Sequence, residues 1–233
     1  MALAEAAPSG WGGFFVVEVT MRAVIFVNGV LTQPERARAL LHGDDLIIAV
    51  DGGTRHAWDV GVDPQLVIGD LDSLSERERQ RLEASGAEIS SFSARKDKTD
   101  LELALLHAVS EGATTILVLA ALGGRLDQTV GNVLLLTSPR LSEVEVRIVD
   151  GGQTAFLIRD EAAVKGEPGD TVSLIPLGGD AVGVTAEGME WPLEDETLHL
   201  GSTRGISNVQ REEQAYVRVQ QGQLLCIVTH ATE

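Results

Sequence analysis

Short apolar runs alternate with helical stripes between residues 21 and 150, and this alternation restricts the possible fold more than any other feature of the chain. The apolar runs predict strands at residues 23–27, 46–50, 66–68, 88–92, 116–121 and 144–149. The stripes between them predict helices at residues 34–41, 54–60, 75–84, 99–110 and 127–137. Strands that alternate with helices form βαβ units, and unbroken apolar runs are typical of strands covered on both faces. The pattern therefore predicts a Rossmann-like, three-layer α/β domain with a mostly parallel sheet.

The pattern changes after residue 150, where no helical stripe of useful length remains. Short apolar runs separated by glycine-rich turns predict strands at residues 153–158, 171–177, 181–186, 198–200, 215–219 and 223–228. Such a series favours a small all-β sandwich. We therefore divide the chain into an N-terminal extension (residues 1–20), an α/β domain (residues 21–150) and a C-terminal β-sandwich domain (residues 151–233).

Acidic and glycine-rich clusters follow the expected strands of the α/β domain. They are Asp51-Gly52-Gly53, Gly69-Asp70-Leu71-Asp72-Ser73, Asp97-Lys98-Thr99-Asp100 and Gly123-Gly124-Arg125-Leu126-Asp127. In an open α/β sheet, ligands bind outside the carboxyl ends of the strands. Carboxylates and glycines gathered there predict one site that holds a metal ion and phosphates.

Asp70 and Asp72 are the strongest metal candidates. Residues i and i+2 of an extended chain point to the same side, so both carboxylates can face one cation. Mg²⁺ prefers hard oxygen ligands and is usually held by one or two carboxylates together with substrate phosphates. The alternative is a turn in which Asp72 or Ser73 caps the next helix, but capping accounts for only one of the two aspartates.

Asp97 and Asp100 have the spacing of a capping box for the helix that follows them. The sequence leaves both this role and a place in the metal site open. Lys98, which lies between them, is either a phosphate contact or an exposed lysine at a helix end.

The run Gly123-Gly124-Arg125 leads into the helix expected at residues 127–137. Glycines let a backbone approach phosphate, and a helix N-terminus offers free N–H groups. Arg125 can bind phosphate oxygens through two N–H groups, while Asp127 can hold Arg125, join the metal or cap the helix. Asp51-Gly52-Gly53 and Asn28-Gly29 offer similar backbone approaches, with plain turn chemistry as the alternative.

Composition and motifs exclude several function classes. The 35 acidic and 18 basic residues leave a net charge of −17, which disfavours nucleic acid and anionic membranes as partners. The chain has no GxxxxGKS/T loop, no GxGxxG after the first strand and no GxSxG elbow. Its five histidines and single Cys226 form no zinc-binding pattern. A lone cysteine, together with the lack of a signal peptide or a membrane-length apolar run, predicts a cytoplasmic protein.

The ordered set of motifs resembles the thiamine pyrophosphokinase family. The matching motifs are DGG at 51–53, GDLDS at 69–73, DKTD at 97–100, GGRLDQ at 123–128, SLIPL at 173–177 and GSTRGISN at 201–208. The resemblance implies Mg²⁺-dependent transfer of a diphosphate group from ATP to the hydroxyethyl oxygen of thiamine, giving thiamine diphosphate and AMP. It also implies a homodimer, in which thiamine lies between the α/β domain of one subunit and the β-domain of the other.

The resemblance also implies roles for individual residues. Asp70, Asp72 and Asp100 match residues around the metal and the phosphates, and together with Arg125 they form the expected catalytic set. Ser207 and Asn208 match residues near the thiamine pyrimidine. The expected ATP- and phosphate-binding residues are Asn28, Asp51, Gly52, Gly53, Asp97, Lys98, Gly124, Arg125 and Asp127.

This chain departs from the family pattern at a few positions. Gln128 stands where many members have His, which leaves the roles of Arg125 and Asp127 intact. Some members place a Trp against thiamine late in the β-domain, where this chain has Leu225-Cys226. We therefore expect no aromatic stacking partner and interpret Trp191 as a packing residue. Two other functions stay open: a diphosphokinase for another alcohol, such as a hydroxymethylpterin, and a non-catalytic nucleotide sensor on the same fold.

Overall fold

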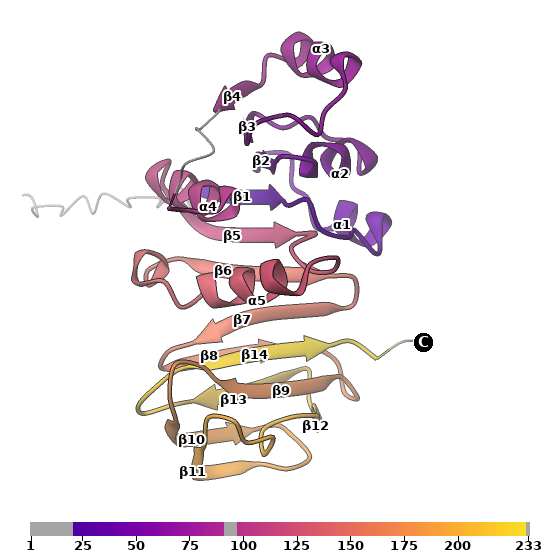
Figure 1. Cartoon of the computed structure of the whole chain (residues 1–233). Helices are drawn as coiled ribbons and strands as arrows, with labels where there is room; N and C mark the ends of the chain where they lie inside the picture. Colours follow the sequence, from indigo (N-terminus) through magenta and orange to yellow (C-terminus); the bar gives the residue numbers. More distant parts are fainter. Residues whose placement is uncertain (1–20, 91–96, 232–233) are drawn as a thin grey trace, which may run out of the picture.

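The computed structural model describes residues 21–90 and 97–231, and the extension expected at residues 1–20 lies outside the described residues. The described chain forms two sheets (Figure 1). A ten-stranded sheet has the strand order β12-β9-β14-β7-β6-β5-β1-β2-β3-β4, and a four-stranded sheet has the order β11-β10-β13-β8. The expected α/β class is confirmed in this form, as a large mixed sheet with helices and a second, antiparallel sheet.

Between residues 21 and 150, the described part of the chain forms six parallel strands and five α-helices. The elements are β1 (Met21–Phe26), α1 (Pro34–Ala39), β2 (Leu46–Val50), α2 (Gly53–Asp59), β3 (Leu66–Ile68), α3 (Glu76–Ser85), β4 (Glu88–Ser90), α4 (Asp100–Ser110), β5 (Ala113–Leu119), α5 (Leu126–Leu135), the 3-10 helix η1 (Pro139–Leu141) and β6 (Glu145–Asp150). Each neighbouring pair among these strands is parallel, as predicted. The strand expected at residues 88–92 is described as far as Ser90, and its last two residues lie outside the described part. Within the described ranges, no helix is long and apolar enough to cross a membrane.

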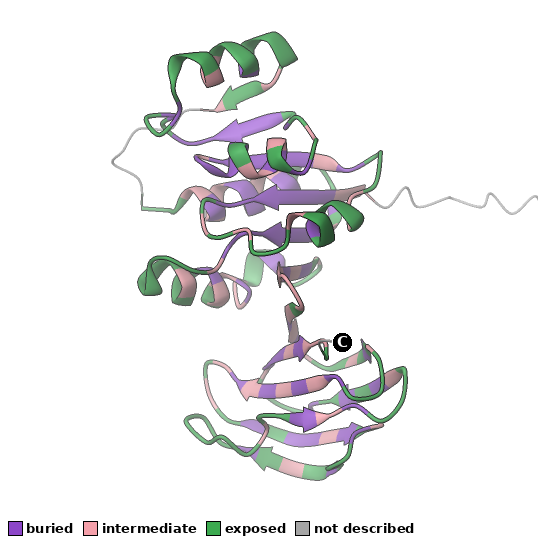
Figure 2. Cartoon of the chain, turned by 90° about the vertical axis from the view of Figure 1, so that its right-hand side faces the viewer, coloured by how far each residue is buried: buried purple, intermediate pink, exposed green. Residues whose placement is uncertain are grey.

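Successive residues of the central strands face opposite helical layers. Ala23 and Ile25 of β1 share a hydrophobic cluster with residues of α4, whereas Val24 and Phe26 share one with residues of α1 and α2. Figure 2 shows buried residues in the strands and exposed residues on the outer sides of the helices. Because the six strands are parallel, their carboxyl ends and the turns that follow lie along one edge of the sheet (Figure 1).

The large sheet continues through the boundary expected near residue 150. The later elements are β7 (Gln153–Ile158), β8 (Glu161–Lys165), β9 (Thr171–Pro176), β10 (Ala181–Glu187), β11 (Leu193–Leu198), β12 (Asn208–Val209), β13 (Gln214–Arg218) and β14 (Leu224–Thr229). β7 pairs antiparallel with β6, and β14, β9 and β12 follow in the same sheet. Alternate residues of β7, β9 and β14, among them Phe156, Leu174 and Cys226, share one core with the four-stranded sheet. Burial raises the pKa of the Cys226 thiol to about 12, so this cysteine is unreactive, as expected.

The sequence pattern missed or misplaced three strands after residue 150. β8 buries only Val164, and β12 has only two residues. β11 lies at Leu193–Leu198 instead of the expected 198–200, with four polar residues between two buried leucines. It is an edge strand whose register against β10 shifts twice, and Asp195 within it has a φ of 53°. These irregularities remove the alternation that reveals a strand.

Side chains cap two of the helices that lie beside the candidate site. Ser75 and Glu78 form the predicted capping box at the start of α3. Of the two roles left open for Asp97 and Asp100, the capping box is not formed. Thr99 caps α4 instead, and its side-chain oxygen accepts a hydrogen bond from the Glu102 amide at 3.2 Å. Helix capping therefore gives no account of Asp97 or Asp100.

Candidate active site

A cavity of about 470 Å³ opens at the carboxyl ends of β1, β2 and β5. Its lining includes five of the predicted site residues, and these are Asn28, Asp51, Asp100, Gly124 and Arg125. They come from four separate turns, which the parallel sheet brings to one edge. Gln128 and Asn132 of α5 also line the cavity, although the sequence pattern assigned no site role to either.

Asp51 is the centre of negative charge in this cavity. Burial, followed by the charges of Asp100 and Asp70, raises the pKa of its carboxyl group from 3.8 to about 6. Its Oδ1 atom is buried and has no hydrogen-bond partner. The backbone of Asp51 has a φ of 47°, and such left-handed residues occur preferentially at ligand sites. A side chain at Gly69 would place its Cβ only 1.7 Å from Asp51 Oδ1, so the glycine is required for this approach.

The turn that carries Asp70 and Asp72 is shaped by its own hydrogen bonds. The Asp72 amide donates to Asp70 Oδ1 at 3.0 Å, and Leu71 between them has a φ of 58°. Leu71 and Leu74 are buried in a small core, whereas Asp70 and Asp72 are exposed. The buried leucines therefore anchor the turn and leave both carboxylates accessible to a ligand.

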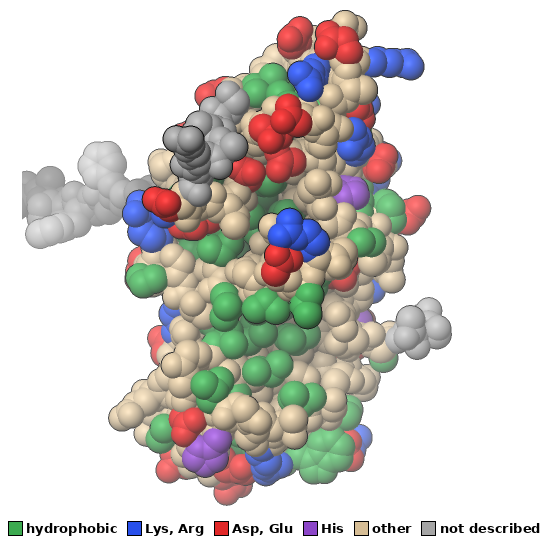
Figure 3. All heavy atoms as spheres, viewed as in Figure 1, with side chains coloured by type: hydrophobic (Ala, Val, Ile, Leu, Met, Phe, Trp, Pro, Cys, Tyr) green, Lys and Arg blue, Asp and Glu red, His purple; other side chains and the backbone are tan. Residues whose placement is uncertain are grey.

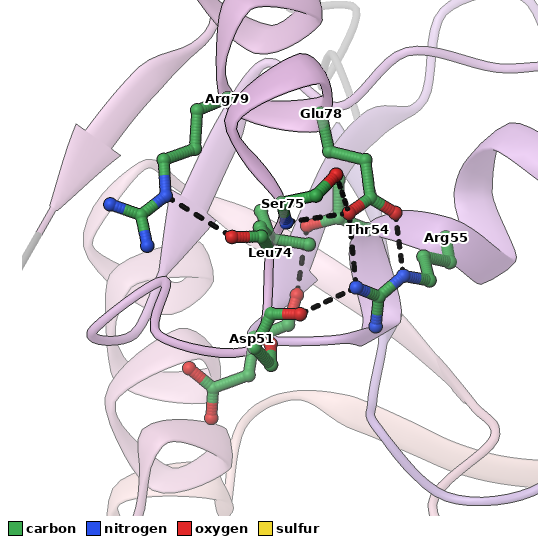
Figure 4. A network of polar contacts seen from close by, with 8 residues as sticks. Asp51, Thr54, Arg55, Leu74, Ser75, Glu78 and Arg79 are labelled. Carbon is green, nitrogen blue, oxygen red and sulfur yellow. Dashed lines mark hydrogen bonds and ion pairs between the residues drawn. The ribbon is translucent and has the colours of Figure 1, made fainter.

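Two arginines hold this turn from outside. Arg55 of α2 donates to Glu78 of α3 at 2.6 Å and to the Ser73 carbonyl oxygen. Arg79 donates to the carbonyl oxygens of Leu74 at 3.2 Å and of Leu71 at 3.1 Å. Figure 4 shows this network, with the Asp51 carboxylate directed away from the Arg55–Glu78 pair. The two arginines thus bind backbone carbonyl oxygens and Glu78, and not Asp70 or Asp72.

Asp70 and Asp100 are near enough to Asp51 for their charges to act on its carboxyl group. The ligand atoms of Asp70, Asp72 and Asp100, however, are not all within 4.8 Å of one another. Among the described residues, the only group of three acidic or histidine side chains with ligand atoms within 4.8 Å of one another is His42, Asp44 and Asp45. Asp45 in that group is already bound to Arg22, with Oδ1 2.7 Å from Arg22 Nε. The assignment of Asp70, Asp72 and Asp100 to a metal stays a prediction, and it is compatible with Mg²⁺, which keeps water and phosphate ligands.

The glycines of the site serve two different purposes. A Cβ atom would lie 2.2 Å from Asn28 Oδ1 at Gly52 and 2.1 Å from the Phe26 carbonyl oxygen at Gly53. The close approach of the start of α2 to the end of β1 therefore requires Gly53, whereas a side chain at Gly52 would displace the side chain of Asn28. Gly124 has a φ of 71° and open space around it, so its backbone is free to approach a ligand.

The charged residues near the cavity mouth are mostly paired with one another. Arg125 Nε lies 3.1 Å from Asp127 Oδ1, and this pairing raises the pKa of Arg125 and lowers the pKa of Asp127. Of the three roles considered for Asp127, the structure thus shows that of holding Arg125. Lys98 pairs with Glu102 at 2.9 Å, and Asp97 is exposed.

A second hollow of about 360 Å³ lies in the β-rich part and contains the predicted Ser207 and Asn208. Asn208 is buried, and its side chain binds both backbone groups of Trp191: Oδ1 accepts from the Trp191 amide at 3.1 Å, and Nδ2 donates to its carbonyl oxygen at 2.6 Å. Trp191 lines the same hollow and is 52% exposed. The expectation that Trp191 is a packing residue is therefore wrong.

No local pattern in the sequence places Trp191 beside Asn208. Trp191 is 17 residues from Asn208 along the chain, so no local spacing joins them. An isolated bridge between Met189 and Gln210 brings the two segments together. Only the strand pairing shows that the hollow has an aromatic wall.

Family models match both parts of the chain. Residues 37–148 match the thiamin pyrophosphokinase catalytic domain, and residues 159–224 match the thiamin pyrophosphokinase vitamin B1 binding domain. The chain belongs to the thiamine pyrophosphokinase family. Thiamine pyrophosphokinase of Bacillus subtilis is 34% identical over 165 residues, which cover 70% of this chain and 77% of that protein.

Solved structures of thiamine pyrophosphokinases have the same fold. The crystal structure from Bacillus subtilis is 29% identical with a TM-score of 0.81, and it covers 91% of this chain and 100% of its own. The structure from Geobacillus thermodenitrificans is 27% identical with a TM-score of 0.80, and covers 91% of this chain and 99% of its own. The resemblance inferred from the motifs is thus confirmed at the level of the family.

Proposed function

We propose that this protein transfers a diphosphate group from ATP to the hydroxyl of thiamine, giving thiamine diphosphate and AMP. One observation carries the proposal: the two family matches coincide with the two candidate sites. The catalytic match contains the cavity residues Asp51, Asp100 and Arg125, and the vitamin B1 match contains Trp191 and Ser207. We keep residues 21–150 as the ATP-binding, Rossmann-like part and residues 151–233 as the thiamine-binding sandwich.

The donors in the cavity suit Mg²⁺. They are hard carboxylate oxygens, and one of them, Asp51 Oδ1, is buried without a hydrogen-bond partner. The like charges of Asp70 and Asp100 act on Asp51, and a divalent cation would relieve this repulsion. We assign Asp70, Asp72 and Asp100 as the residues that would hold the ion. When bound, Mg²⁺ neutralises charge on the phosphates of ATP.

The turn from Gly123 to Arg125 provides the complementary positive groups. Gly124 leaves its backbone open, and the first turn of α5 offers free N–H groups that favour phosphate. Arg125 binds the phosphates through its guanidinium group, for which Asp127 holds it ready in the free protein. Asn28, Asp51, Gly52, Gly53, Asp97 and Lys98 complete the nucleotide-binding surface of this proposal.

The reaction requires the thiamine hydroxyl to reach the ATP phosphates next to the carboxylates of Asp70, Asp72 and Asp100. One of Asp70, Asp72 and Asp100 orients or deprotonates it, since each of these side chains belongs to the same cluster of turns. Diphosphoryl transfer depends mainly on positioning and charge neutralisation. The chain has a net charge of −17, which also favours the approach of thiamine, a cation.

The second hollow has the chemistry to hold thiamine. An exposed indole attracts a cationic ring through its face, and Trp191 offers such a face beside Ser207. Asn208 contributes by fixing the backbone of Trp191. The Ser207 amide donates to Ser173 Oγ at 3.1 Å, which leaves the hydroxyl of this exposed residue to bind the substrate.

The distance between the two sites favours a homodimer. Strands β9 and β12, which border the hollow, are five and six steps from β1 in the large sheet. At roughly 4.8 Å per step, this separates hollow and cavity by roughly 24 to 29 Å, which is longer than a thiamine molecule. A thiamine held in the hollow of one chain would therefore react at the cavity of a second copy.

An uncovered apolar face is available for that second copy. α5 exposes Leu126, Val130 and Leu134, and the same side of β7, β9 and β14 carries the half-buried Leu157, Ile175 and Ile227. Figure 3 shows hydrophobic side chains gathered over the middle of this face. Among the described elements, no helix lies over these three strands in the view of Figure 1. Apolar patches of this kind mark association sites.

Two alternatives make different predictions about the acceptor. A diphosphokinase for a hydroxymethylpterin would keep the cavity but would have no need for a cation-binding hollow. A nucleotide sensor would bind ATP and release no AMP. The exposed Trp191 beside Ser207 favours thiamine over both. The cytoplasmic location expected from the sequence stays a prediction.

An acceptor screen tests the proposed function. The purified protein is incubated with ATP and Mg²⁺ and either thiamine or a hydroxymethylpterin, and AMP is quantified by chromatography. We expect AMP with thiamine only, and none after chelation of the metal. AMP release with the pterin alone, or ATP binding without AMP in any mixture, would overturn the proposal.

A further inference from the structure

Helix α5 buries a polar residue while several of its apolar residues are exposed. Leu126 is 77% exposed and Val130 and Leu134 are also exposed, yet the only buried residue of the helix is Asn132, at 4%. Burying an amide is unfavourable unless it is hydrogen-bonded. Val133 and Leu135 of the same helix pack against the core but are only half-buried. A helix that buries an asparagine more deeply than any of its apolar residues therefore needs a specific reason for that asparagine.

The partner of Asn132 lies in the turn between β5 and α5. Asn132 Nδ2 donates to the Ala121 carbonyl oxygen at 2.7 Å. The residue before it, Ala120, has a φ of 54°, which costs free energy for a residue with a side chain. Such a conformation persists only where the surroundings hold it in place.

The neighbouring carbonyl groups of this turn are also held. Gly29 and Val30 donate to the carbonyl oxygens of Ala120 and Leu122 at 2.8 and 2.9 Å. A side chain at Gly29 would bring its Cβ within 2.4 Å of the Ala120 oxygen. Three consecutive carbonyl groups are therefore fixed, the outer two by the β1–α1 turn and the middle one by Asn132. The next residues along the chain are Gly123, Gly124 and Arg125.

We propose that Asn132 is a positioning residue for the nucleotide: it fixes the turn before Gly123 so that Gly124 and Arg125 meet the phosphates of ATP. The inference rests on the proposed function, because it assigns Arg125 to phosphate. Asn132 lines the same cavity as Arg125 and Gly124, but it acts through the Ala121 carbonyl and not on the reacting atoms. The thiamine hollow, on strands remote from α5, is independent of it.

Two variants separate positioning from a merely structural role. Asn132→Leu keeps the size of the side chain but removes the hydrogen-bond donor. Asn132→Ser keeps a donor, but the shorter side chain reaches the Ala121 carbonyl oxygen less well than asparagine does. The matched control is Thr129→Ala, since Thr129 lies on the same helix and does not line the cavity. Displacement of a reacting group by about 1 Å can lower a rate about 100-fold.

Steady-state kinetics and binding of a non-hydrolysable ATP analogue give the decisive readouts. We expect kcat/KM for ATP and the analogue affinity to fall roughly 10- to 100-fold in Asn132→Leu. Asn132→Ser should fall between Asn132→Leu and the wild type, and the KM for thiamine should change less than about twofold. Thr129→Ala should match the wild type.

Three outcomes would overturn the inference. One is a folded Asn132→Leu with unchanged nucleotide parameters, and another is an equal loss for both substrates. The third outcome concerns the case in which Asn132→Leu does not fold. In that case, an Asn132→Ser variant that folds and binds the analogue with wild-type affinity would overturn the inference. Failure of the proposed function is recognised separately, as a wild-type protein that makes no product from thiamine, and analogue binding still tests Asn132 in that case.

Discussion

At the scale of single residues, Asp72 is the simplest test of the carboxylate cluster. It is exposed, and its turn is anchored by the buried Leu71 and Leu74. We therefore expect Asp72→Asn to lower kcat by at least about 100-fold while the melting temperature stays unchanged. Asp59→Asn, an exposed substitution at the end of α2, is the control. Near-normal turnover in Asp72→Asn would remove Asp72 from the metal site.

Trp191 makes a second prediction at this scale, specific to thiamine. Loss of a cation–π contact of about 1 to 2 kcal/mol corresponds to a rise in thiamine KM of roughly 5- to 30-fold. We expect this rise in Trp191→Ala, with the KM for ATP unchanged, in steady-state assays with each substrate varied in turn. Tyr216→Ala is the matched control, because Tyr216 is an exposed aromatic residue outside the hollow. A rise of equal size in both variants would contradict the assignment.

The raised pKa of Asp51 predicts how the stability of the folded protein depends on pH. Asp51 has a folded-state pKa of about 6, which lies above the ordinary value of 3.8, so the folded protein binds the proton more tightly than the unfolded chain. The stability that this group contributes is present below about pH 4 and is lost as the pH rises through about 6. Asp51→Asn should therefore be more stable than the wild type at pH 7, by on the order of 1 kcal/mol because the side chain is half exposed.

Urea unfolding at pH 4.5 and pH 7 measures this difference. The gap between variant and wild type should open at pH 7 and shrink at pH 4.5. Added Mg²⁺ should stabilise the wild type more than Asp51→Asn at pH 7, because the cation offsets the crowded negative charge. A variant that is less stable than the wild type at pH 7 without metal would contradict the proposed charge repulsion.

At the scale of elements, the pair Arg55–Glu78 joins α2 to α3 and holds the turn that carries Asp70 and Asp72. Arg55 and then Ser75 lower the pKa of Glu78 to about 2, but the pair is largely exposed, so its effect on stability is small. We expect Arg55→Ala to lower kcat roughly 10-fold with a loss of stability of no more than about 1 kcal/mol. Activity assays and thermal unfolding distinguish the two effects. A large loss of stability with full turnover would show that the pair is structural only.

The elements also show which parts of the fold a sequence can specify. The strands β2 and β3 match the predicted residues because each is an unbroken apolar run with turn residues on both sides, and β7 matches because its apolar residues 155–158 lie between two turns. The edge strand β11 was misplaced because its polar residues face solvent and its register shifts. An apolar pattern in the sequence indicates buried residues, and an edge strand buries few of its residues.

The candidate site was predictable to a similar degree. Asp51, Asp100 and Arg125 follow strands, and the rule for parallel sheets brought them to one cavity. The roles of Asn132 and Trp191 were not predicted, because they depend on partners that no local spacing reveals. The partner of Asn132 is a carbonyl oxygen in a turn, and the partner of Trp191 is Asn208, which is 17 residues away. The capping residue of α4 was missed because Thr99 competes with Asp97 for the same role.

At the scale of the whole molecule, the proposed dimer predicts that two impaired variants regain activity when they are mixed. Asp72→Asn impairs the cavity, and Trp191→Ala impairs the hollow. If each active site combines the cavity of one subunit with the hollow of the other, a mixed dimer contains one intact site. An equimolar mixture that exchanges subunits should then recover about a quarter of wild-type activity at low thiamine concentration. Recovery no greater than the mean of the two separate variants would place both halves of the site in one chain.

³¹P NMR can show whether a diphosphate group moves as one unit from ATP to thiamine. The protein is mixed with ATP, Mg²⁺ and thiamine, and the phosphorus signals are followed through one reaction. We expect the signals of thiamine diphosphate and AMP to grow in equal amounts while the ATP signals decline, with no ADP signal. Growth of ADP with a thiamine monophosphate signal, or no change in the ATP signals, would contradict it.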